Sequence, residues 1–160
     1  GADAPRAILI IDTLLLNEAD LTAYDRSTAY QTRASCKVTL GDYAGGLDDF
    51  KAALDASGLP PNQAREVSRY IGYLHFDLGH YREAIDYLAP IAGPDSEDFR
   101  ANLYLATAYV ELGDYQSAEI YALRAAELKP ENQQARAIVA KINDALGGSG
   151  ELKQFEFDPV

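Results

Sequence analysis

Residues 99–131, FRANLYLATAYVELGDYQSAEIYALRAAELKPE, decide the fold, because other parts of the chain repeat their spacing. Small or apolar residues recur at helical spacing on both sides of an interruption at Gly113-Asp114. These residues are Leu103, Ala106 and Val110 before the interruption, and Tyr115 and Ala118 after it. Pro130 ends the second run. The stretch therefore predicts two helices joined by one tight turn.

The same turn recurs along the chain as a glycine, a polar residue and a tyrosine. It is found as Gly41-Asp42-Tyr43, Gly79-His80-Tyr81 and Gly113-Asp114-Tyr115, and a further glycine stands at position 147. The glycines at 41, 79, 113 and 147 are 38, 34 and 34 residues apart. Four extra residues in the loop around residues 57–61 account for the longer first interval. A period near 34 predicts a stack of similar helix pairs.

This period and turn resemble the tetratricopeptide repeat, a helix-turn-helix unit of the same length. The family pattern places a large apolar residue, a small residue, an aromatic residue, Gly, Tyr and Ala at fixed positions. The unit that ends at Pro130 fits them with Leu105, Ala106, Tyr109, Gly113, Tyr115 and Ala118. The preceding unit has His75 at the aromatic position. The first unit departs from the pattern at Arg33, Lys37 and Gly46.

The resemblance implies an all-α, right-handed α-solenoid of about three and a half helix-turn-helix units with a C-terminal capping helix. We expect one domain over residues 1–146. Its predicted parts are an N-terminal helix at 5–16, repeats at 22–56, 62–92 and 95–128, and the capping helix at 132–146. Residues 147–150, Gly-Gly-Ser-Gly, are typical of a flexible linker. The tail at 151–160 fits no repeat.

Composition limits the classes of partner. The formal net charge is −11 and the isoelectric point is near 4.5, which argues against nucleic acid and anionic membranes as partners. The apolar run at 5–16 is too short to span a bilayer. Because it is apolar almost all round, we expect cover on more than one side. Either it packs as a half-repeat on the first unit, or it also forms a homodimer contact.

The start of the chain bears on the compartment. There is no methionine, and the first residues are Gly-Ala-Asp-Ala-Pro. This start is compatible with a cleaved exported protein, as in the bacterial periplasm, and equally with a protease scar. We favour the exported, periplasmic location slightly over a cytoplasmic one. The single Cys36 leaves the redox compartment open.

No pattern of catalytic residues stands out. His75 and His80 are five residues apart, which does not place them on one helical face as a metal pair. We expect His75 to be packed, His80 to lie in a turn and Cys36 to be a buried structural thiol. The chain has no phosphate-binding glycine loop, nucleophile elbow or metal signature. We therefore expect no enzyme, no cofactor and no metal.

The resemblance also implies a concave groove lined by the first helix of each pair. The predicted peptide-binding residues are Gln31, Ser35, Arg69, Tyr70, Tyr73, Phe76, Arg100, Leu103, Tyr104, Thr107 and Lys141, and Thr28 and Thr32 also fall on groove positions. Tyrosine and arginine are common anchors of interfaces. One branch of the family clamps a C-terminal carboxylate, but of that clamp only Arg100 keeps its charge here. We therefore expect an extended peptide with aromatic side chains as the ligand.

The function expected is that of a non-enzymatic adaptor for assembling protein complexes. A self-associating assembly protein that uses the helix at 5–16, without a peptide ligand, is the alternative. The tail adds a ligand-like segment with three apolar side chains, Leu152, Phe155 and Phe157. It is either a native disordered tail or an engineered fusion. We expect it to bind the groove of its own chain or of a neighbour.

Overall fold

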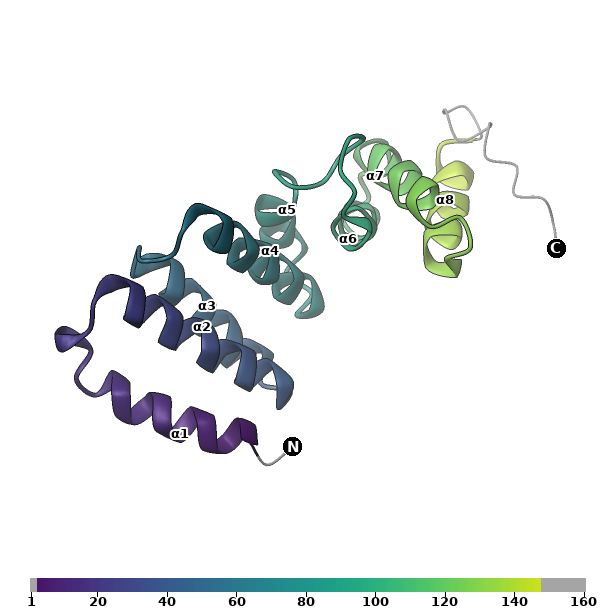
Figure 1. Ribbon diagram of the computed structural model, residues 1–160. Coiled ribbons are helices and arrows are strands. Elements are labelled where there is room, and N and C mark those ends of the chain that lie inside the picture. The colour runs from purple at the N-terminus through teal and green to yellow at the C-terminus, as the bar shows by residue number, and fades with distance from the viewer. Residues whose placement is uncertain (1–2, 148–160) are drawn as a thin grey trace. The chain divides into compact units, whose positions relative to one another are not determined.

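The computed structural model describes residues 3–147, and these form α-helices and one short 3-10 helix, without strands (Figure 1). The helices are α1 (Asp3–Leu15), η1 (Glu18–Asp20), α2 (Ala23–Thr39), α3 (Tyr43–Asp55), α4 (Pro61–Asp77), α5 (Tyr81–Leu88), α6 (Phe99–Glu111), α7 (Tyr115–Leu128) and α8 (Gln133–Ala145). The all-α prediction is confirmed. The chain divides into two compact units, one ending at Gly79 and the other beginning at His80.

The repeated glycines end helices in the same way. Gly41, Gly79, Gly113 and Gly147 all have positive φ, between 66° and 86°. After α6, the Gly113 N–H donates to the Val110 carbonyl at 3.1 Å, and the Asp114 N–H donates to the Tyr109 carbonyl at 2.9 Å. These two bonds satisfy carbonyls that the helix end leaves open, and the left-handed residue they need is favourable for glycine. The spacing of these glycines in the sequence is therefore the spacing of the helix ends.

The connection between α5 and α6 is longer than expected. Repeats at 62–92 and 95–128 predict that one helix reaches residue 91 and that the next begins at 95. Instead α5 ends at Leu88 and α6 begins at Phe99. The Asp98 side chain caps α6 by accepting the Ala101 N–H at 3.0 Å. The fully buried Asn102 secures the loop, because its Oδ1 accepts the Gly93 N–H at 3.0 Å.

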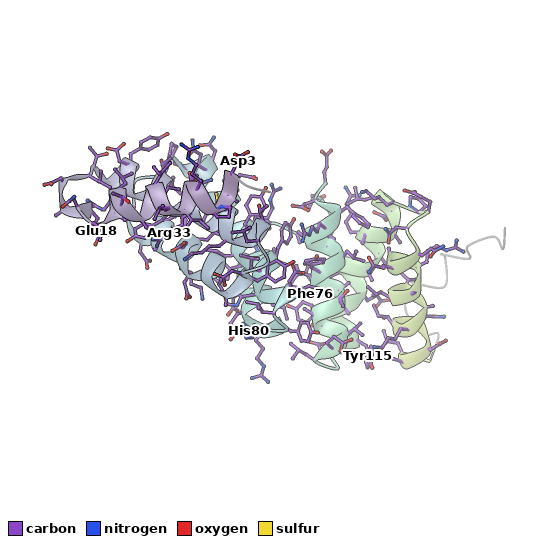
Figure 2. All side chains as sticks on the ribbon, turned by 90° about the horizontal axis from the view of Figure 1, so that it is seen from below. Asp3, Glu18, Arg33, Phe76, His80 and Tyr115 are labelled. Carbon is purple, nitrogen blue, oxygen red and sulfur yellow. The ribbon has the colours of Figure 1, made fainter. Side chains whose placement is uncertain are left out.

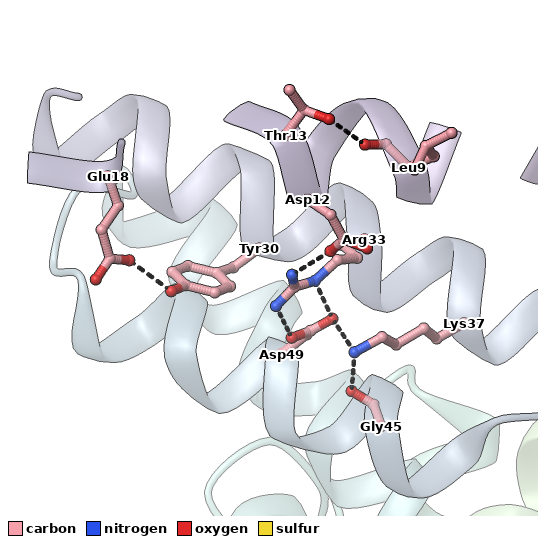
Figure 3. Close-up of polar contacts among 9 residues, drawn as sticks. All are labelled: Leu9, Asp12, Thr13, Glu18, Tyr30, Arg33, Lys37, Gly45 and Asp49. Atoms are coloured by element: carbon pink, nitrogen blue, oxygen red, sulfur yellow. Dashed lines mark hydrogen bonds and ion pairs between the residues drawn. The ribbon is translucent and has the colours of Figure 1, made fainter. Parts of the chain in front are cut away.

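In the N-terminal unit, α2 packs between α1 and α3, and α4 packs on α3. Arg33 and Lys37, which depart from the repeat pattern, both reach the buried carboxylate of Asp49 on α3 (Figure 3). Gly46 departs for a different reason. A Cβ at Gly46 would lie 2.6 Å from Val38 Cγ2, so this position allows α2 and α3 to approach closely.

α1 has less cover than its apolar sequence predicts. Within the N-terminal unit it packs on α2, with Ile11 buried. Leu9 and Leu16 are 68% and 81% exposed, and Ile10 and Leu14 are also exposed. The expectation of cover on more than one side is therefore wrong within this unit. Figure 2 shows α1 with Asp3 at its start and Glu18 beyond its end.

The C-terminal unit has a core of small side chains. Its buried cluster consists of Ala106, Val110, Ala118, Ala122, Ala126, Val139 and Ile142, drawn from α6, α7 and α8. The alanines let the helix backbones approach closely, so a side chain larger than methyl does not fit at the alanine positions. α5 packs on α6 in the same unit. No helix in the described residues is long and apolar enough to cross a membrane.

Candidate functional site

An aromatic cluster lies on α4. The ring of Tyr70 stacks on Phe50 of α3, with 5.9 Å between centroids and 9° between planes. Tyr73 meets the Tyr70 ring edge-on at 6.3 Å and 88°. Tyr70 nevertheless stays 45% exposed. Two neighbours thus fix its ring in place while part of it still faces solvent, as suits a rigid contact for a ligand.

In both units an arginine lies beside a tyrosine, which is exposed in α4 and half-buried in α6. In α4, the Arg69 guanidinium carbon lies 5.9 Å from the Tyr70 ring centroid, and Arg69 forms an ion pair with Glu66. In α6, Arg100 Nη2 donates to the Tyr104 hydroxyl at 2.9 Å, and its guanidinium carbon lies 4.9 Å from that ring. Each pair presents an aromatic surface beside a cation that can donate to carbonyls or carboxylates.

Two of the predicted contact residues are core residues. Tyr73 and Leu103 are each only 6% exposed. Leu103 packs with Ala125 and Ala135, because α7 and α8 cover its side of α6. The expectation that these two residues face a ligand therefore needs correction. Tyr73 supports Tyr70, and Leu103 holds α6 in the unit.

The other predicted positions lie at or near the surface. Gln31, Phe76 and Thr107 are half-buried, and Ser35, Arg100 and Lys141 are exposed. Ser35 donates to the Gln31 carbonyl at 3.1 Å, and Thr107 donates to the Leu103 carbonyl at 2.8 Å. Lys141 Nζ lies 3.7 Å from Glu111 Oε1. The tail residues Leu152, Phe155 and Phe157 lie outside the described residues.

The sequence did not predict a role for Phe50, whose ring stacks on Tyr70 from a neighbouring helix. Phe50 fits the apolar pattern of the first repeat, so only packing reveals its second role. It also missed Phe99, whose ring centroid lies 4.5 Å from Lys129 Nζ. Both pairs join residues at least 20 positions apart, and no local pattern connects them.

A polar network replaces apolar packing in the first repeat. Arg33 donates from Nε and Nη2 to the two oxygens of Asp49 at 2.8 and 2.7 Å, and from Nη1 to Asp12 on α1 at 2.6 Å (Figure 3). These bonds, with Asp49 first, raise the pKa of Arg33 above its ordinary value. Lys37 Nζ lies 2.8 Å from Asp49 Oδ2. The network joins α1, α2 and α3.

Two tyrosine pKa values are raised by local structure. The Tyr30 hydroxyl donates to Glu18 Oε2 at 2.7 Å, which raises the pKa of Tyr30, and burial adds to the effect. Burial is also the main cause of the raised pKa of Tyr109, which stacks on Tyr121 at 5.7 Å. Both phenols therefore remain protonated at neutral pH, as packing and hydrogen-bonding groups.

The remaining candidates for chemistry have structural surroundings. His75 is buried, and His80 is exposed at the turn before α5. Cys36 is a free thiol but only half-buried, so the prediction of a buried thiol is corrected. Residues 3–147 hold no group of three or more His, Cys, Asp or Glu side chains placed to bind a metal ion.

Helix pairs ended by left-handed glycines, with aromatic and arginine side chains on one helix of a pair, define a helical-repeat protein. The tetratricopeptide repeat model matches residues 32–96 and 71–133, which together span more than half of the chain. The chain therefore belongs to the tetratricopeptide repeat family. No curated protein sequence matches it.

Solved structures share this fold at low sequence identity. A MamA crystal structure is 14% identical, with a TM-score of 0.74 over 99% of this chain and 90% of that one. YrrB, described as a TPR protein with an unusual peptide-binding site, is 18% identical, with a TM-score of 0.65 over 92% and 80%. The first TPR of Spaghetti (RPAP3), bound to the HSP90 peptide SRMEEVD, is 18% identical, with a TM-score of 0.63 over 78% and 95%.

Proposed function

We propose that this chain is a non-enzymatic scaffold that binds an extended, partly aromatic peptide segment of a protein partner. The observation that carries the proposal is the fixed, half-exposed ring of Tyr70 with Arg69 beside it. The exposed faces of α4 and α6 are two proposed contact surfaces, one in each unit. Family membership supports the proposal, since two of the solved relatives are described with a bound peptide or a peptide-binding site.

The physical basis is preorganisation. Phe50 and Tyr73 already hold the Tyr70 ring, so a ligand loses little side-chain entropy when it packs there. Buried aromatic anchors and arginines supply most of the free energy at many interfaces. Arg100 and Tyr104 repeat this combination in the C-terminal unit. A ligand with both aromatic and hydrogen-bond-accepting groups is therefore favoured.

The test is a pull-down followed by calorimetric titration of the captured partner's binding segment as a synthetic peptide. We expect Tyr70→Ala with Tyr104→Ala to weaken binding at least tenfold without lowering the melting temperature by much. Tyr43→Ala is the matched control, because Tyr43 is exposed to a similar extent on α3. Unchanged affinity in the double variant, or equal loss in the control, would contradict the proposal.

The tail at residues 151–160 is a candidate ligand within the same chain. Leu152, Phe155 and Phe157 provide apolar groups, and Glu156 and Asp158 provide partners for Arg69, Arg100 or Lys141. Binding in cis or in trans would occur at the high effective concentration that a short linker gives. Deletion of 151–160 and titration with the same ten residues as a free peptide tests this. No binding at millimolar peptide, with unchanged tyrosine fluorescence on deletion, would exclude the tail.

One observation favours the alternative function, self-association through α1. Leu9, Ile10 and Leu14 on α1 are exposed, as are Leu16 directly after it and Tyr24 on α2. Exposed apolar side chains that gather on one surface mark interaction sites. We expect a homodimer in light scattering if this reading holds, and a monomer after Leu9→Ser with Leu16→Ser. A monomer before and after the change would exclude self-association through α1.

The periplasmic location stays a prediction from the sequence.

A further inference from the structure

We propose that the groove between α1 and α2 is a second subsite, which binds a large apolar side chain followed by a lysine or arginine of the partner. This inference rests on the proposed function and specifies the partner's chemistry. The groove encloses about 360 Å³. It is lined by Ile11, Leu14, Leu21, Tyr24, Asp25, Thr28, Ala29 and Thr32. Its volume lies within the range of about 300–1,000 Å³ that is common for ligand pockets.

The space follows from the residues on one face of α2. Positions 25, 28, 29 and 32 recur at helical spacing, so they stand on successive turns of one side. Three of them, Thr28, Ala29 and Thr32, are short, and they leave room between α2 and the larger Ile11 and Leu14 of α1. Leu14 is 45% exposed at this groove. The walls are therefore apolar and open to solvent.

A polar group in the groove is left without a partner. Thr28 Oγ1 is buried and has no hydrogen-bond partner among the described residues. Buried hydroxyls almost always form hydrogen bonds, because water has been removed from them. Less than 1 Å² of Thr28 Oγ1 is accessible, so protein atoms already cover this hydroxyl and it does not contact a ligand in the groove. The apolar walls and Asp25 are therefore the groups that can select a ligand.

Asp25 sets the charge of the ligand. Its Oδ2 accepts the Thr22 hydroxyl at 2.6 Å, and it forms no ion pair with any described residue. A carboxylate beside an apolar groove, in a chain of net charge −11, attracts a cationic group. The tail contains Leu152-Lys153, but Glu151, Glu156 and Asp158 lie around this lysine and leave the segment with a negative net charge. A segment with a positive net charge fits the groove better, so we assign it to a basic, apolar segment of another protein.

The test uses four fluorescein-labelled octapeptides, Gly-Ser-Leu-X-Z-Gly-Ser-Gly, with X as Phe or Ala and Z as Lys or Glu. We expect the Phe-Lys peptide to bind at least tenfold more tightly than the Ala-Lys and Phe-Glu peptides. The preference for Lys should weaken as salt rises, because salt screens the attraction to Asp25. Anisotropy titrations of the full chain measure all four affinities. Equal affinities, or no binding of the Phe-Lys peptide at millimolar protein, would overturn the proposal.

Variants of the groove locate the binding. Ala29→Leu fills the space and should weaken the Phe-Lys peptide at least tenfold, whereas Ala44→Leu, an exposed position of α3, should not. Asp25→Asn keeps the shape of the groove and should remove most of the preference for Lys over Glu. This variant tests the proposal even if Ala29→Leu impairs folding. Thr28→Val should raise the melting temperature and leave the peptide affinity unchanged, because the hydroxyl is covered by protein atoms and unpaired.

Two outcomes separate this subsite from the rest of the protein. If partner binding depends on Tyr70 and Tyr104 while Asp25→Asn and Ala29→Leu leave it unchanged, the groove proposal fails and the proposed function stands. If the Phe-Lys peptide binds through the groove while Tyr70→Ala and Tyr104→Ala leave partner binding unchanged, the proposed function fails and the groove proposal stands. If α1 of a second copy occupies the groove, peptide binding will weaken as protein concentration rises, which would also overturn the proposal.

Discussion

Asp49 is the residue on which the first repeat depends. Its carboxylate is buried on α3 and receives Arg33 and Lys37 from α2 (Figure 3). In the family pattern these two positions carry apolar side chains, so the network takes the place of hydrophobic contacts. A buried ion pair of this kind is costly to break on one side, because the remaining charges are left in a poorly solvated site.

The first prediction follows from this arrangement. Asp49→Ala should lower the free energy of unfolding by about 3–5 kcal/mol, because Arg33 and Lys37 lose their buried partner. Urea denaturation followed by circular dichroism measures the change. Asp48→Ala removes an exposed carboxylate one residue away and should change stability by less than about 0.5 kcal/mol. A similar loss in both variants would show that the network does not stabilise the unit.

At the scale of the element, the contact between α2 and α3 depends on the absence of a side chain at Gly46. Alanine is usually the better helix former, by about 0.5–1 kcal/mol. Here a Cβ would stand 2.6 Å from Val38 Cγ2 and 3.2 Å from the Ala34 carbonyl oxygen. The close approach makes Gly46→Ala destabilising, because the free-energy cost of overpacking exceeds the gain in helix propensity.

We therefore predict that Gly46→Ala destabilises the protein by about 1–3 kcal/mol. Val38→Ala in the same chain should restore part of the loss, because it removes the nearest methyl group. Thermal unfolding of the two single variants and the double variant measures this compensation. A Gly46→Ala variant that is more stable than the wild type would contradict the close-approach reading.

At the scale of the whole molecule, the chain separates buried residues that hold the units together from exposed residues that we propose bind a partner. Its two terminal helices also differ. The exposed positions of α8 are Gln133, Gln134, Ala137, Ala140, Lys141, Asp144 and Ala145. These side chains are polar or no larger than alanine. The exposed positions of α1 include the large apolar residues Leu9, Ile10 and Leu14, beside polar ones such as Arg6 and Asp12. These exposed apolar side chains are the reason that we assign partner contacts to the region around α1.

The separation predicts opposite effects for two substitutions. Ala118→Leu should lower the free energy of unfolding by about 1–3 kcal/mol, because Ala118 is fully buried in the α6–α7–α8 core. The peptide affinity of its folded fraction should not change. Tyr70→Ala should instead weaken peptide binding with a smaller loss of stability. Melting temperature and calorimetric affinity, measured on both variants, check the prediction, and equal changes in both quantities would contradict it.

The sequence by itself determined the repeat family and the four helix-ending glycines. Local sequence also explains the starts of α7 and α8, where Asp114 and Asn132 each accept a backbone N–H at 3.0 Å. These features could be predicted because helical spacing, left-handed glycines and capping side chains act over a few residues. Only the tertiary structure decided which side chains of the expected groove remain exposed. Tyr73 and Leu103 are buried by neighbouring residues, Phe50 supports Tyr70 across 20 positions, and α1 with α2 forms the groove that contains Thr28. Such contacts depend on how helices from different repeats pack, and the period within one repeat does not encode them.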